Sequence, residues 1–147
     1  MTPDLRTAVG DLRLANPVLT ASGTFGYGLD LEDLCPPERL GGIVTKGLSP
    51  LSRRGNQPPR IAETAAGMLN AIGLQNIGVE AFCSDVLPEL RRRSVTVVVN
   101  VFGESPAAYR EVIARCERAA GVAAYELNVS CPNVSAGGIE FGHRPAA

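Results

Sequence analysis

The chain has 147 residues, 45% hydrophobic and 20% charged, which is ordinary for one globular domain with a sizeable core. Its formal net charge of −1 excludes the strongly basic surface typical of nucleic-acid binding, and its apolar runs are too short for a membrane span. Four cysteines without metal-ligand spacing and a single histidine argue against a metal centre, so we expect a cytoplasmic protein with reduced thiols.

The first part of the chain predicts a small hairpin and a short buried strand. The hairpin pairs residues 7–9 with residues 12–14 and turns at Gly10. Residues 18–21 form the strand, which runs directly into the glycine-rich segment 22–28. Small residues after a strand let a flat ligand approach the backbone, but a plain glycine-rich turn explains the segment equally well.

A second strand and a long connection come next. Residues 30–34 predict a short helical turn, and residues 42–45 predict the second buried strand. Lys46 follows directly, and at the C-terminal end of a strand its ammonium group is either solvated or directed at an anion. Residues 48–77 are rich in proline, glycine, asparagine and arginine, yet they are too apolar for a solvated linker. We interpret them as an ordered excursion that lines a pocket.

The alternation of helix and strand continues after this excursion. Residues 78–93 predict a helix that kinks or splits at Pro88. Residues 95–101 form a near-continuous apolar run, typical of a strand covered on both faces. Asn100 is the polar exception in that run. A buried amide without a partner costs about 1–3 kcal/mol, so Asn100 must be hydrogen-bonded, either within the protein or to a ligand.

A second helix and a fourth strand complete the pattern. Ser105 and Pro106 are typical of an N-cap and a first helical residue. Residues 123–128 form the strand, which must end before Pro132 because proline cannot donate to a ladder. Cys131 lies in the loop that follows. From its position alone, it is more often a small buried hydrophobe than a catalytic thiol.

Strands that alternate with helices predict an α/β fold with a parallel sheet. A doubly wound sheet would carry a phosphate-binding glycine fingerprint, which this sequence lacks. A (β/α)₈ barrel fits better, because polar residues recur where successive strands end and such ends converge on one face of a barrel. These strand-end residues are Ser22, Lys46, Asn100 and Asn128.

Four segments carry a resemblance to a known family: residues 16–28, 42–46, 60–76 and 126–133. They resemble dihydroorotate dehydrogenases of class 1, the soluble enzymes, and particularly the NAD-linked catalytic subunit. Membrane-bound class 2 members resemble the chain less, because they carry serine where Cys131 stands. The resemblance covers nearly the whole chain, so residues 1–147 are expected to be the N-terminal part of a single barrel domain.

The resemblance implies an FMN-containing (β/α)₈ barrel that oxidises dihydroorotate to orotate in pyrimidine (UMP) synthesis. It implies that Cys131 is the catalytic base, and that Lys46 pairs with the substrate carboxylate and touches the flavin. The residues implied to contact FMN are Ser22, Lys46, Gly47, Asn100 and Asn128. Those implied to contact the substrate are Lys46, Asn70, Ala71, Ile72, Gly73, Leu74, Asn128 and Asn133.

The chain is too short to form a complete barrel. A (β/α)₈ barrel takes about 250 residues, so the chain would hold roughly its first four strands and have little or no activity alone. In the NAD-linked subclass, electrons leave FMN through a partner subunit with FAD and a 2Fe–2S cluster, for which this chain has no cysteine cluster. The complete enzyme is expected to be a homodimer. Two alternatives stay open: a related FMN barrel (fumarate-linked dihydroorotate dehydrogenase or dihydropyrimidine dehydrogenase) and a non-catalytic half-barrel.

Overall fold

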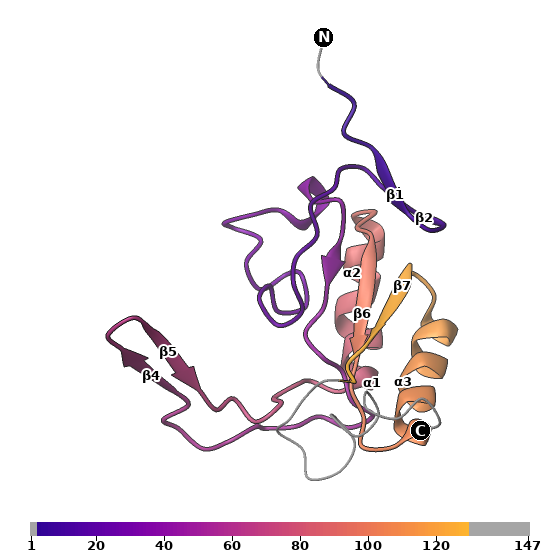
Figure 1. Cartoon of the computed structure of the whole chain (residues 1–147). Coiled ribbons are helices and arrows are strands. Elements are labelled where there is room, and N and C mark those ends of the chain that lie inside the picture. Colours follow the sequence, from indigo (N-terminus) through magenta and orange to yellow (C-terminus); the bar gives the residue numbers. More distant parts are fainter. Residues whose placement is uncertain (1–2, 130–147) are drawn as a thin grey trace.

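The computed structural model describes residues 3–129, and its centre is a parallel sheet with helices packed against one face (Figure 1). The sheet contains β3 (Ile43–Val44), β6 (Val97–Val101) and β7 (Ala124–Leu127), with β6 in the middle. Both pairings are parallel, as expected when a helix connects successive strands. The predicted α/β class with a parallel sheet is therefore confirmed for this part of the chain.

The short buried strand predicted over residues 18–21 is neither regular nor buried. It is present only as a single parallel bridge between Leu19 and Gly42, and the side chains of Val18 and Leu19 are exposed. Thr20 explains the irregular pairing. Its hydroxyl accepts a hydrogen bond from the backbone N–H of Val44 at 2.9 Å. The Thr20 hydroxyl thus accepts a hydrogen bond from a backbone N–H that would donate to a backbone carbonyl in a regular ladder. The segment nevertheless runs beside β3, and its end lies close to the end of that strand.

The helix predicted over residues 78–93 is one helical rod with a widened middle. It consists of α1 (Val79–Ala81), the π-helical segment η2 (Phe82–Val86) and α2 (Leu87–Arg92). Pro88 lacks the N–H that would bond one turn back, and its ring crowds the carbonyl there. A wider turn directly before the proline relieves that conflict. The helix is thus continuous but irregular directly before Pro88, where the sequence predicts that it kinks or splits.

The second predicted helix is α3 (Pro106–Ala119). Ser105 is its N-cap, and the Ser105 Oγ accepts a hydrogen bond from the backbone N–H of Ala108 at 3.3 Å. This satisfies one of the free N–H groups of the first turn, as the sequence predicts. Neither α3 nor any other helix between residues 3 and 129 is long and apolar enough to cross a bilayer.

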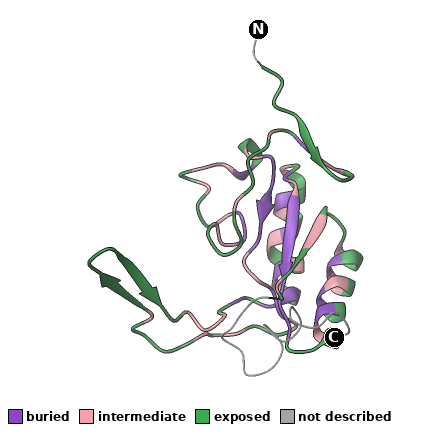
Figure 2. Cartoon of the chain, viewed as in Figure 1, coloured by how far each residue is buried: buried purple, intermediate pink, exposed green. Residues whose placement is uncertain are grey.

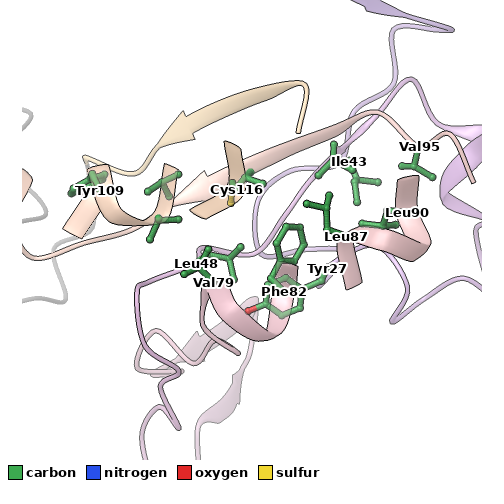
Figure 3. Close-up of a cluster of buried hydrophobic side chains, with 14 residues drawn as sticks. Tyr27, Ile43, Leu48, Val79, Phe82, Leu87, Leu90, Val95, Tyr109 and Cys116 are labelled. Carbon is green, nitrogen blue, oxygen red and sulfur yellow. The ribbon is translucent and has the colours of Figure 1, made fainter. Parts of the chain in front are cut away.

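Strand β6 supplies the centre of the hydrophobic core. Val97, Val99 and Val101 alternate along it toward the helices, and each is 0% exposed. Burying a side chain of this size contributes about 1.5–3 kcal/mol. Figure 3 shows the helix and loop residues that meet in this core, among them Leu48, Phe82, Leu87, Leu90 and Cys116. By the same alternation, Val98 and Asn100 point to the other face of the sheet.

The N-terminal hairpin is confirmed. It consists of β1 (Thr7–Val9) and β2 (Leu12–Leu14), which pair antiparallel around Gly10. Residues 30–34 form hydrogen-bonded turns, as predicted, although the neighbouring helical element is the short 3₁₀ helix η1 (Pro37–Arg39). Proline in its first turn fits this position, because no N–H is needed there.

The long excursion is ordered as predicted, but it contains a hairpin that the sequence analysis missed. Strands β4 (Ile61–Thr64) and β5 (Gly67–Asn70) pair antiparallel and form an arm, residues 61–70, that stands away from the sheet. Every residue of the two strands is exposed (Figure 2). Their turn lacks an Asn-Gly or Asp-Gly pair, which is the usual short-range signal for a hairpin.

Candidate active site

A cavity of about 160 Å³ lies at the C-terminal ends of the sheet strands, and we call it the strand-end cavity. Four of its residues follow or end separate strand segments, so the predicted convergence of strand-end polar groups is confirmed. The residues that line the cavity are Ser22, Gly23, Lys46, Gly47, Leu74, Gln75, Asn100, Phe102 and Asn128. The cavity thus brings together one cation, one hydroxyl, several amides and exposed backbone.

Backbone hydrogen bonds fix where β3 delivers Lys46 and Gly47. The N–H of Lys46 donates to the Gly26 carbonyl at 2.8 Å, which ties the glycine-rich segment to the strand end. A Cβ at position 47 would stand 2.8 Å from Asn100 Oδ1, closer than real Cβ contacts come. Glycine is therefore needed there, and the amide of Asn100 packs directly over the backbone of Gly47.

Asn100 is held on three sides and is 4% exposed. Its backbone N–H donates to Thr45 Oγ1 at 3.2 Å, and its carbonyl accepts from the N–H of Leu48 at 2.9 Å. Its side-chain Nδ2 donates to Glu126 Oε1 at 2.5 Å. The expected partner of this buried amide is thus a carboxylate on the neighbouring strand.

The importance of Glu126 was missed by the sequence analysis. The register of β6 and β7 places Glu126 directly opposite Asn100, and period-2 alternation places it on the same face as Asn128. Register across two strands separated by a helix cannot be read from one sequence. The available signal was spacing, since Glu126 lies two residues before a predicted site residue on the same strand.

Asn128 is fixed by its backbone. Its N–H donates to the Val101 carbonyl at 2.9 Å, and its own carbonyl accepts from the Tyr109 hydroxyl at 2.6 Å. The first bond continues the ladder between β6 and β7, and the second joins the strand end to helix α3. Asn128 therefore stands at a rigid point beside the cavity.

A second cavity of about 380 Å³ lies at the base of the arm, and we call it the arm-base cavity. Four of the five consecutive residues predicted to bind substrate line it, and Leu74 borders both cavities. Ile72 contributes its carbonyl, which accepts from the N–H of Asn56 at 3.1 Å. The residues that line the arm-base cavity are Arg53, Asn56, Asn70, Ala71, Gly73 and Leu74.

Buried and charged side chains outside the predicted set anchor this loop. Asn76, 5% exposed, accepts from the N–H of Gly78 at 2.9 Å and donates to Ser49 Oγ at 2.8 Å and to the Leu74 carbonyl at 3.0 Å. It thus stabilises Leu74, which has a φ of 56°. Arg53 donates to Glu104 and stacks over the Phe102 ring, with 5.1 Å to the ring centre.

The described cysteines lie away from both cavities. Cys116 is 0% exposed in the core, and burial raises the pKa of its thiol to about 12. Burial also raises the pKa of Cys83, which is partly buried. Neither thiol is suited to proton transfer at neutral pH. Among residues 3–129, no group of three or more His, Cys, Asp or Glu side chains could hold a metal ion.

Cys131 and Asn133 lie outside the described residues. Their predicted roles as base and substrate ligand therefore stay predictions. The chain reaches Cys131 three residues after Asn128, whose place beside the strand-end cavity is fixed.

A family model described as dihydroorotate dehydrogenase matches residues 4–147. The dihydroorotate dehydrogenase B (NAD(+)) catalytic subunit of a Geobacter species is 50% identical over 145 residues, which cover 99% of this chain and 48% of that one. The corresponding subunit of Pelobacter propionicus is 51% identical over 146 residues, with the same two coverages. The chain spans about half the length of the curated relatives it matches.

Two further likenesses bear on subclass and fold. A putative dihydroorotate dehydrogenase A (fumarate) of Aquifex aeolicus is 51% identical over 142 residues, which cover 97% of this chain and 46% of that one. The crystal structure of DHODH from Eimeria tenella in complex with ferulenol matches with a TM-score of 0.67 at 21% identity. That match covers 91% of this chain and 39% of that one. At this identity, the likeness indicates a common fold.

Proposed function

Because this chain belongs to the dihydroorotate dehydrogenase family, we propose that it is the N-terminal part of the catalytic subunit of an NAD-linked dihydroorotate dehydrogenase. The complete enzyme oxidises (S)-dihydroorotate to orotate in de novo pyrimidine synthesis in the cytoplasm, and its fold is a (β/α)₈ barrel. The observation that carries this proposal is the convergence of Lys46, Asn100 and Asn128 on one strand-end cavity. Active sites of such barrels lie at the C-terminal ends of the strands.

The residues of the strand-end cavity fit one edge of FMN. Gly47 and Asn100 pack closely against each other in one wall of this cavity, since a Cβ at position 47 would stand 2.8 Å from Asn100 Oδ1. Ser22, Asn100 and Asn128 supply donors and acceptors for ring carbonyl and N–H groups. Lys46 supplies a positive charge beside them. When bound, FMN supplies a hydride acceptor for the reaction.

The substrate would lie between the two cavities, which meet at Leu74. Lys46 pairs with its carboxylate, and the amides of Asn70, Asn128 and Asn133 bind its ring N–H and carbonyl groups. Cys131 removes the proton from C5 while the hydride leaves C6, so that the C5–C6 double bond of orotate forms. A free thiol has a pKa of about 8.5, so the site must favour the thiolate for Cys131 to act as base.

In the NAD-linked subclass, a partner subunit with FAD and a 2Fe–2S cluster would supply the electron acceptor, and the catalytic subunit would form a homodimer. The names of the Geobacter and Pelobacter relatives support the NAD-linked subclass. The Aquifex relative, equally similar to this chain, supports fumarate as the alternative acceptor. Reduction of NAD⁺ through an added partner subunit, against direct reduction of fumarate, separates the two subclasses.

The test uses this chain extended to the length of its relatives. Anaerobic addition of dihydroorotate should bleach the visible absorbance of the bound flavin and yield orotate. A Cys131→Ser variant should retain its flavin but bleach severely more slowly. Loss of the flavin in this variant would contradict the role of Cys131 as base, and a wild-type protein that is not bleached would contradict the proposed function.

A further inference from the structure

Glu126 and Asn100 form a pair on the face of the sheet opposite the helices. They stand directly opposite each other on the neighbouring parallel strands β7 and β6. Asn100 Nδ2 donates to Glu126 Oε1 at 2.5 Å, and such charge-assisted bonds are about twice as strong as neutral ones. Asn100 is buried and lines the strand-end cavity, whereas Glu126 is exposed beside it.

The carboxylate determines which end of the amide faces the cavity. The side chain of asparagine has a donor end and an acceptor end, and the two are nearly equal in shape. An ionised carboxylate only accepts, so Glu126 binds the Nδ2 end and turns the oxygen away from itself. That oxygen lies on the side of Gly47, 2.8 Å from where a Cβ at position 47 would stand. The wall of the cavity therefore presents an acceptor at this point.

We propose that Glu126 is a positioning residue that locks the Asn100 amide with its oxygen toward the strand-end cavity, so that the site selects a ligand with a ring N–H. This inference rests on the proposed function. FMN has such a group, a single N–H between two carbonyls in its pyrimidine-like ring. An amide free to turn would present its donor end to the cavity part of the time and weaken that recognition.

A plainer role for Glu126 is to satisfy a buried amide, and glutamine would fill that role equally well. Glu126→Gln keeps the size of the side chain and its ability to accept. It also adds a donor, which can bind the Asn100 oxygen and turn the Asn100 amide around. The two roles therefore predict different results for this substitution.

The experiment measures FMN affinity and the visible spectrum of bound FMN in the protein extended to the length of its relatives. For Glu126→Gln we expect a dissociation constant raised about tenfold, together with a shifted flavin spectrum. The double variant Asn100→Asp, Glu126→Gln should regain most of the affinity. In it, the glutamine donates to one aspartate oxygen, and the other oxygen again presents an acceptor to the cavity.

Glu117→Gln is the matched control. Glu117 also accepts a hydrogen bond at 2.6 Å, from the Tyr125 hydroxyl on the same strand β7, and it belongs to helix α3. The Glu117→Gln substitution should leave FMN affinity unchanged. If Glu126→Gln does not fold, Glu126→Asp replaces it, and we expect a smaller loss of affinity because the acceptor is kept but withdrawn by one methylene.

Two results would overturn the inference. One is wild-type affinity and spectrum in Glu126→Gln, and the other is a double variant that binds no better than Glu126→Gln. In both cases, dihydroorotate oxidation by the wild-type protein would leave the proposed function standing. A wild-type protein that binds no FMN would overturn the proposed function and the inference together.

Discussion

The sheet and the arm hold their residues in place by different means. Strand β6 is buried along its whole length, and packing against the helices fixes its position. The arm, residues 61–70, is exposed along both strands, and polar contacts at its base, such as those of Asn76, hold the loop that follows it. In the proposed function, the sheet thus carries the flavin ligands and the arm base carries much of the substrate site. Packing of the sheet against the helices fixes the positions of the flavin ligands, and a small hydrogen-bond network fixes the positions of the substrate ligands.

The largest expected effect separates the two regions by stability. Phe82 is 0% exposed in the core, and Phe82→Ala should lower the free energy of unfolding by about 3–5 kcal/mol. Met68 on the arm is 60% exposed, and Met68→Ala should change the free energy of unfolding by less than about 0.5 kcal/mol. Denaturant unfolding of the extended protein measures both. Comparable losses would mean that the arm is packed against the rest of the protein.

A second substitution tests the network at the arm base. Asn76→Ala removes a buried amide and leaves the N–H of Gly78 and the Leu74 carbonyl without this partner, which should cost about 1–3 kcal/mol. We expect the KM for dihydroorotate to rise while FMN content stays near the wild-type value. Gln57→Ala, an exposed amide before the arm, is the control. Loss of FMN in Asn76→Ala would contradict the division between the two regions.

The same substitution at two glycines compares the regions directly. Gly47→Ala places a methyl group 2.8 Å from Asn100 Oδ1, and such overpacking costs about 1–3 kcal/mol. It should weaken FMN binding. Gly67→Ala on the arm meets nothing nearer than Thr64 Oγ1 at 3.7 Å, so stability and FMN binding should stay unchanged. Titration with FMN checks both variants, and tight binding by Gly47→Ala would show that no ligand approaches this backbone.

The smallest effect is a dependence of stability on pH at the end of α2. Hydrogen bonds from Arg92 and Arg93 lower the pKa of Glu89 from 4.5 to about 2. A carboxylate whose pKa is lowered in the folded state stabilises the fold at pH values above its ordinary pKa. That stabilisation is lost as the pH falls toward the folded-state pKa. Unfolding midpoints measured between about pH 5 and 2 should therefore fall less steeply in Glu89→Gln. The effect is small because exposed ion pairs are screened by solvent. If the unfolding midpoint of Glu89→Gln fell with pH as steeply as that of the wild type, the lowered pKa of Glu89 would be contradicted.

Where burial dictates structure, the sequence predicted it well. The apolar run over residues 95–101 predicted a covered strand and contains β6, Ser105 marked a helix start, and Pro88 marked the irregular turn in the preceding helix. The arm was missed because an exposed hairpin leaves no strong apolar pattern and its turn has no Asn-Gly pair. The position of Asn76 as an anchor depends on contacts with residues far away in the chain.

The candidate site was likewise predictable only in part. Strand ends in a parallel sheet must meet at one edge, so the gathering of Lys46, Asn100 and Asn128 followed from their positions alone. The pairing of Asn100 with Glu126 did not, because register between two strands separated by a helix is set by tertiary packing.

The most direct test of the central claim, that the strand-end cavity holds FMN, is a visible absorbance spectrum. The wild-type protein, extended to the length of its relatives, and its Asn100→Leu variant are each mixed with FMN and freed of excess. The wild type should retain a near-stoichiometric flavin band, whereas Asn100→Leu, which keeps the volume but loses both polar ends, should retain little. Equal retention by the two proteins would contradict the claim.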